Sequence, residues 1–342
     1  MAAAGASRSV TRPTWTPLRD DRDGALALID AVAAEDRAAG RDEEAGYLAS
    51  SRPEVERGTV PGALVRDPEG EPWGLAAWRT IGDLGRTVAP LLLAKKHRTP
   101  DGWRGLLSMV VETPDPSGPV LLLNDRLAGR PESETAQVLV PRGFSAFHRY
   151  GLVFPPGTPL PPGPARPLMR GRLRPVGPSD LEPLARLSAV CYAGSIDRFL
   201  FTNVSDPVEG ARSLLRTLFD GRYGEYLEGS SFGLEIDGEL LGAALVTRAR
   251  DGKLLADVSV HPDLQGQGHA RRLIRACLET AAREPTLPVR LAVTRENVRA
   301  FRLYRDLGFV IEKGPGTLWA NTTALGIPRP SPAGEAEGPA PP

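Results

Sequence analysis

A proline-rich segment over residues 154–167 constrains the fold of this chain more than any other feature. It reads FPPGTPLPPGPARP, and neither a helix nor a central strand can run through it, because each proline lacks the backbone N–H that both structures use. The chain has 342 residues, more than one ordinary core covers. We therefore predict two domains, at 15–154 and 169–325, joined by a linker at 155–168.

Composition limits the location and the partners of the chain. Basic and acidic side chains balance at 42 each, so charge favours neither nucleic acid nor a membrane as a partner. Cys191 and Cys277 lie far apart and show no metal-type spacing, and no apolar run has the length of a signal peptide or a membrane span. We expect a cytoplasmic protein without a metal, and disordered ends at 1–14 and 326–342.

The two halves of the chain repeat one pattern. Residues 232–248 (FGLEIDGELLGAALVTR) place an Asp-Gly turn between two apolar runs, which is typical of a β-hairpin, and residues 62–80 (GALVRDPEGEPWGLAAWRT) follow the same plan. An LGF segment at 307–309 follows the first hairpin, and an RGF segment at 142–144 follows the second at a similar distance. We infer two copies of one α/β fold, each a mixed central sheet flanked by helices.

The second half alternates strand and helix patterns. Ser179 or Asp180 is a typical N-cap and predicts a helix through LEPLARLSAVCY. Apolar residues recur at three- and four-residue steps in the segment after 268, which predicts a helix with one buried face: Leu273, Ile274, Cys277, Leu278 and Ala281. The other predicted elements are strands at 171–176, 253–260, 289–294 and 309–314, and helices at 207–219 and 297–307.

The segment SVHPDLQGQGHARRL (259–273) joins a strand to a helix through a loop of small residues. Such a loop presents unpaired N–H groups at the positive end of the helix dipole, which suits an anion. Gly266 and Gly268 permit positive φ and a close approach of the anion. A Walker A loop is excluded because its lysine is absent, and a dinucleotide fingerprint is disfavoured because Arg271 stands where a small residue is needed.

Gln265, Gly268 and Ala270 form the pattern QxxGxA, which resembles the acyl-coenzyme A loop of the GCN5-related N-acetyltransferase (GNAT) family. The downstream segment TRENVRAFRLYRDLGFVIEK (294–313) matches the helix that follows this loop in the family. The resemblance implies two splayed parallel strands, 253–260 and 289–294, with the pantetheine arm of acetyl-CoA between them. The binding residues that it implies are Val258, Val260, Gln265, Gly266, Gln267, Gly268, His269, Ala270, Arg271 and Asn297.

The resemblance also implies acyl transfer from acetyl-CoA to a primary amine, which we expect to belong to a small molecule. Tyr304 matches the position of the general acid, although it is alternatively an aromatic on a buried helix face. Asp257 is the first candidate for the base and Glu235 the second, and Asp257 is alternatively a solvent-facing carboxylate. Asn297 is alternatively only an N-cap. The alternative functions are a non-catalytic acyl-CoA binder, a protein or peptide N-acetyltransferase, and a nucleotide-binding protein.

The first half departs from this pattern where chemistry would occur. The segment KKHRTPDGWRGLLSMVVE (95–112) lacks QxxGxA, and Pro100 and Trp103 occupy the region where N–H groups should converge. No tyrosine stands in the helix that corresponds to 297–307. We therefore predict a degenerate copy that binds no coenzyme, and we expect the segment 194–206 of the second half to line the acceptor pocket.

Overall fold

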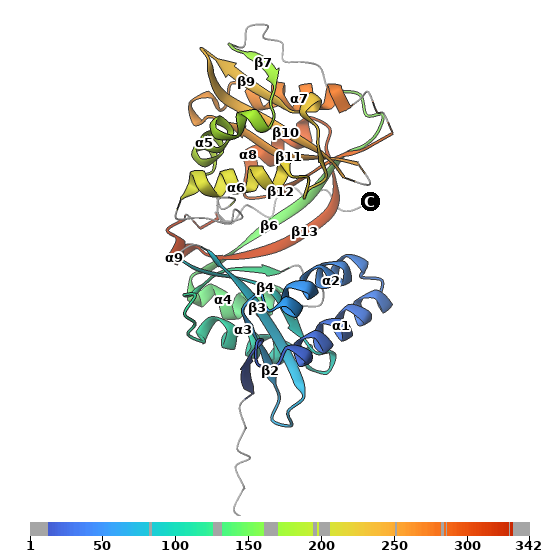
Figure 1. The fold of residues 1–342 in the computed structure, drawn as a ribbon, viewed down its shortest axis with the longest axis vertical. Helices are drawn as coiled ribbons and strands as arrows, with labels where there is room; N and C mark the ends of the chain where they lie inside the picture. Colours follow the sequence, from blue (N-terminus) through green and yellow to red (C-terminus); the bar gives the residue numbers. More distant parts are fainter. Residues whose placement is uncertain are drawn as a thin grey trace, which may run out of the picture. The chain divides into compact units, whose positions relative to one another are not determined.

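The computed structural model describes residues 13–81, 84–125, 132–160, 170–193, 197, 206–249, 252–281, 284, 286–327 and 329–330. The chain divides into two compact units, drawn in Figure 1. The first unit comprises Met1–Ala146 and Leu318–Leu325, and the second comprises Phe147–Thr317 and Gly326–Pro342. No helix among the described residues is both long enough and apolar enough to span a membrane.

Two strands pass from one unit into the other. Strand β6 (Phe144–Phe154) enters the second unit at Phe147, and β13 (Val310–Asn321) enters the first unit at Leu318. The units therefore do not coincide with the linear ranges 15–154 and 169–325, because each unit takes a strand segment from the other half of the sequence. Residues 161–168 of the predicted linker and most of the predicted disordered ends lie outside the described residues.

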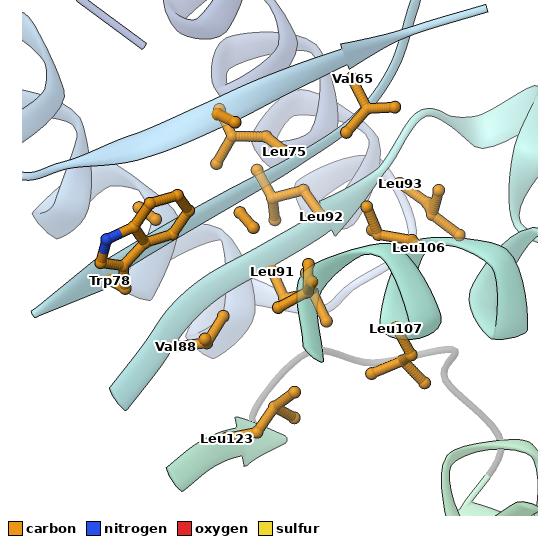
Figure 2. Close-up of a cluster of buried hydrophobic side chains, with 14 of the residues drawn as sticks. Val65, Leu75, Trp78, Val88, Leu91, Leu92, Leu93, Leu106, Leu107 and Leu123 are labelled. Carbon is orange, nitrogen blue, oxygen red and sulfur yellow. The ribbon is translucent and has the colours of Figure 1, made fainter. Parts of the chain in front are cut away.

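The first unit contains a mixed sheet with strands in the order β1-β2-β3-β4-β5, in which only β4 and β5 pair in parallel. Figure 2 shows Leu106 and Leu107 of one helix packed among strand residues such as Leu91 and Leu92. The elements are β1 (Thr14–Pro17), α1 (Arg22–Ala38), α2 (Asp42–Arg57), β2 (Gly62–Arg66), β3 (Pro72–Ile81), β4 (Gly85–Leu93), α3 (Pro100–Glu112), β5 (Val120–Asp125), α4 (Glu132–Leu139) and α9 (Thr322–Leu325).

The second unit has the strand order β7-β9-β10-β11-β12-β6, and the short β8 pairs with β10. Its mixed sheet flanked by helices confirms the predicted fold class. The elements are β7 (Arg172–Pro175), α5 (Leu181–Tyr192), α6 (Pro207–Phe219), β8 (Glu225–Tyr226), β9 (Phe232–Ile236), β10 (Glu239–Ala249), β11 (Gly252–Val260), α7 (His269–Ala281), β12 (Val289–Thr294) and α8 (Val298–Asp306).

Alternating residues of β10 build a core on each face of this sheet. Ala243 and Leu245 pack with α5 and α6, whereas Ala244 and Val246 pack with α7. Successive side chains of a strand point to opposite faces, so one apolar strand serves both layers. Asp180 is the N-cap residue of α5, as predicted, but its side chain makes no capping bond to this helix; its carboxylate instead accepts bonds from the N–H of Gly177 and from Arg174.

Candidate functional site

Strands β11 and β12 separate after two paired residues. They pair in parallel only at Lys253↔Val289 and Leu254↔Arg290, although β11 continues to Val260 and β12 to Thr294. On its other side β11 stays paired with β10 as far as Val260, and β12 stays paired with β6 along its whole length. The inner edges of the two strands therefore present backbone groups to a gap, as the resemblance predicts.

A β-bulge bends β11 where the separation begins. Leu245 of β10 pairs with Asp257 and Val246 pairs with Leu255, so that Ala256 has no partner in β10. An extra residue in one strand increases the local twist and bends that strand. The bulge therefore accounts for the direction in which β11 leaves its parallel neighbour.

The loop between β11 and α7 leaves the N–H groups of residues 266–271 without an acceptor in the described part of the chain. The first backbone bond of α7 runs from the N–H of Arg272 to the carbonyl of Gly268 at 3.1 Å. Gly266 and Gly268 have φ values of +80° and +88°, where a side chain costs about 1–2 kcal/mol. These N–H groups lie at the positive end of the helix dipole, so the loop is suited to bind an anion.

Gln265 fixes this loop to the end of β11. Its N–H donates to the carbonyl of Pro262 at 3.1 Å, and its side-chain Nε2 donates to the carbonyl of Val260 at the same distance. Arg299 Nη1 in turn donates to Gln265 Oε1 at 2.9 Å, and its other nitrogen lies beside Gly266. Sequence reasoning missed Arg299, which brings positive charge to the loop from the first turn of α8.

A cavity of about 330 Å³ lies next to the loop, walled by α5, β11, α7 and α8. Gln267 and Asp257 are not part of its wall; the exposed Gln267 side chain donates to the carbonyl of Asp263 at 2.9 Å. The cavity brings together most of the predicted site residues, namely Val258, Val260, Gln265, Gly266, Gly268, His269, Ala270, Arg271, Asn297 and Tyr304. Its wall also contains residues that sequence reasoning did not select, among them Cys191, Tyr192 and Ser259.

Asp257 lies close enough to Tyr304 to influence the protonation of its phenol. Burial, followed by the negative charges of Asp257 and Asp197, raises the pKa of the Tyr304 phenol above its usual value. Asp257 accepts hydrogen bonds from Tyr192 Oη at 2.5 Å and Ser259 Oγ at 2.9 Å, and burial raises the pKa of its carboxyl group. A phenol that keeps its proton and a carboxylate that readily gains one are suited to acid and base roles.

Two other predicted residues have structural partners. Asn297 caps α8, because its Oδ1 accepts a bond from the N–H of Ala300 at 3.2 Å. Glu235 forms ion pairs with Arg172 at 3.0 Å and Arg174 at 2.8 Å, and these partners, Arg174 first, lower the pKa of its carboxyl group. Glu235 is also absent from the cavity wall, so the geometry favours Asp257 over Glu235 as the base.

The loop before α3 corresponds to the loop after β11 but offers fewer N–H groups to an anion. Thr99 caps α3: its Oγ1 accepts a bond from the N–H of Gly102 at 3.1 Å, and its carbonyl accepts one from the N–H of Trp103 at 3.0 Å. Pro100 has no N–H, and the Trp103 side chain is buried. This loop therefore has one N–H group bonded to a side chain and one missing, whereas the N–H groups of residues 266–271 have no acceptor among the described residues.

The described residues contain no group of three or more His, Cys, Asp or Glu side chains placed to hold a metal ion. Of the segment 194–206, which we expect to line the acceptor pocket, only Asp197 and Asp206 belong to the described residues. Asp197 accepts bonds from Arg149 at 2.9 Å and from Thr294 Oγ1 at 3.0 Å, and its charge acts on Tyr304.

Residues 202–309 match the sequence model of the acetyltransferase (GNAT) family. Two solved structures share the fold. A GCN5-related N-acetyltransferase from Sphaerobacter thermophilus is 17% identical, with 90% of this chain and 96% of that chain covered at a TM-score of 0.52. A tandem GNAT protein from the clavulanic acid biosynthesis pathway, solved without AcCoA, is 18% identical, with 90% and 98% covered at a TM-score of 0.50. No curated protein sequence matches the chain.

Proposed function

We propose that the chain is an N-acyltransferase that uses acetyl-CoA, because residues 202–309 match the GNAT family model and the solved structures that share its fold include a tandem GNAT protein. The acceptor in this proposal is a primary amine of a small molecule. The observation that carries the proposal is the coincidence of two features, the strand gap between β11 and β12 and the unpaired N–H groups of residues 266–271.

The residues of the cavity fit acetyl-CoA at both of these features. The N–H groups of residues 266–271 would bind its diphosphate, with Arg271 and Arg299 adding positive charge nearby. The edge of β11 at Val258 and Val260 would bind the pantetheine arm as a strand binds an added neighbour. Acetyl-CoA would supply an electrophilic thioester carbonyl and a thiolate leaving group.

Two proton transfers are needed, because an ammonium group is not a nucleophile and a thiolate leaves more readily when it is protonated. Asp257 would accept the proton of the acceptor nitrogen, and its raised pKa makes it a stronger base than an ordinary aspartate. Tyr304 would hold its proton until negative charge develops on the sulfur and then donate it. A backbone N–H near Val258 would stabilise the oxyanion.

We also propose a reducing, cytoplasmic location. Both cysteines are free thiols, and Cys277 is buried in the core of the second unit.

Burial, followed by the charge of Asp257, raises the pKa of the Cys191 thiol to about 12, so that this cavity residue stays protonated. Neither cysteine is therefore assigned a nucleophilic role.

The test is incubation with acetyl-CoA and a panel of small amines and peptides, followed by a measurement of free thiol. Thiol release with a small amine supports the proposed function, and release only with peptides indicates a peptide N-acetyltransferase instead. Tight binding of acetyl-CoA without thiol release from any acceptor indicates a non-catalytic binder. Thermal stabilisation by NAD or ATP, but not by coenzyme A, would indicate a nucleotide-binding protein.

A further inference from the structure

Asp257 does not line the cavity itself, but two side chains that donate hydrogen bonds to it do. Tyr192 Oη donates to Asp257 Oδ1 at 2.5 Å, and Ser259 Oγ donates to Oδ2 at 2.9 Å. Both Tyr192 and Ser259 belong to the cavity wall. A proton that leaves an amine in the cavity therefore meets a hydroxyl group before it meets the carboxylate.

Of these two hydroxyl-bearing residues, Tyr192 has more surface available to a ligand. Ser259 is only 2% exposed, whereas Tyr192 is half-buried. A phenol that donates its proton keeps oxygen lone pairs with which it can accept a hydrogen bond. Burial, followed by the charge of Asp257, also raises the pKa of Tyr192 well above its usual value. The phenol therefore gives up its own proton only as it receives another.

We propose that Tyr192 contacts the acceptor nitrogen and relays its proton to Asp257. An N–H bond of the acceptor ammonium breaks and an O–H bond forms on Tyr192 Oη, while the proton that Tyr192 already donates to Asp257 crosses to Oδ1. The amine becomes neutral and gains the lone pair that it needs for attack. Tyr192 is again a neutral phenol, and Asp257 becomes a neutral acid.

The surroundings of Asp257 suit it as the final holder of this proton. Burial raises the pKa of its carboxyl group, and the like charge of Asp197 acts in the same direction. Asp197 is itself paired with Arg149. The groups that face or act on Asp257 are Cys191 and Tyr192 of α5, Val258 and Ser259 of β11, Tyr304 of α8, and Asp197.

The relay rests on the proposed acetyl transfer, and its test compares two variants by kcat/KM for the amine across a range of pH. Tyr192→Phe and Ser259→Ala each remove one donor from Asp257, so both should shift the acidic limb of the profile toward higher pH. Only Tyr192→Phe removes the relay. We expect Tyr192→Phe to lower the plateau of kcat/KM by about 10²-fold, and Ser259→Ala, which keeps the relay, to lower it much less.

A second readout separates the relay from a packing role. An amine that is already neutral at the assay pH has no proton to lose before attack, so it should restore much of the rate of Tyr192→Phe. The affinity of this variant for acetyl-CoA should equal that of the wild type. The relay would be overturned, while the proposed function stands, by either of two results. One is an equal plateau of kcat/KM in the two variants, and the other is an equal loss of rate in Tyr192→Phe with neutral and protonated acceptors. No thiol release by the wild type with any amine would overturn both.

Discussion

Leu254 of β11 and Arg290 of β12 are the last paired residues of two parallel strands that both continue beyond them. Parallel neighbours normally share evenly spaced hydrogen bonds along their length, so the loss of pairing leaves two strand edges with backbone groups to satisfy. The open loop after β11 lies at the same end of that strand. A ligand with an amide-containing arm and a diphosphate satisfies both features at once.

Substitution of Gly268 should weaken acetyl-CoA binding. A Gly268→Val change places a β-branched side chain at φ +88° in the loop that would hold the diphosphate. We expect the dissociation constant from calorimetry to rise at least tenfold, or about 1.4 kcal/mol.

Gly238 provides a matched control for backbone strain. It has φ +85° in the turn between β9 and β10, and no atom lies within 4 Å of the position that a Cβ would take there. Gly238→Val should lower the melting temperature to a similar degree and leave acetyl-CoA affinity unchanged. Equal affinity losses in both variants would count against the loop as the diphosphate site.

Removal of the Tyr304 hydroxyl should slow turnover without weakening coenzyme binding. Tyr304→Phe retains the ring, which contacts Phe309 edge-on at 5.7 Å between centroids, so the packing of α8 should persist. We expect kcat to fall by about 10²-fold because the thiolate then leaves without a positioned acid. Steady-state kinetics would measure this change, and turnover at the wild-type rate would remove Tyr304 from the mechanism.

Asp257 should set the acidic limb of the pH profile. Its carboxyl group must be ionised to accept a proton, so kcat/KM should rise with pH through a pKa above the ordinary aspartate value of about 3.9. Asp257→Asn should abolish this limb and lower the rate. Glu235→Gln is the control, because Glu235 is held by Arg172 and Arg174 away from the cavity, and its profile should match the wild type.

The first copy should contribute stability but no coenzyme site. Thr99→Ala removes the side-chain cap of α3 and should lower the free energy of unfolding by about 1 kcal/mol. Titration should give one acetyl-CoA per chain, with the same affinity before and after this change. A stoichiometry of two, or a loss of affinity in the variant, would be inconsistent with a degenerate first copy.

Local patterns in the sequence predicted much of the second unit. The helix over 207–219 and the strand over 289–294 have the predicted bounds, because proline, capping residues and apolar runs act within a few residues of the elements that they define. The exchange of strand segments between units has no such local signal. Pairing of β6 with β12 joins residues 149–154 to 289–294, and no sequence periodicity records so distant a partner.

Sequence patterns predicted the part of the cavity that the backbone of the glycine loop forms. They did not predict the side chains that other elements bring to it. Glycines in the loop after β11 carry a recognisable pattern. Tyr192 was missed because it ends an apolar helix and looks like a core residue, and only the fold brings it to Asp257. Arg299 was missed because a charged residue on a polar helix face usually contacts solvent, whereas here it donates to Gln265.

The most direct test of the central claim is a crystal structure of the chain with acetyl-CoA. We predict that the diphosphate oxygens lie within hydrogen-bond distance of N–H groups of residues 266–271, with the pantetheine arm between β11 and β12. A complex in which those N–H groups contact no phosphate, or in which acetyl-CoA binds only elsewhere on the chain, would contradict the account.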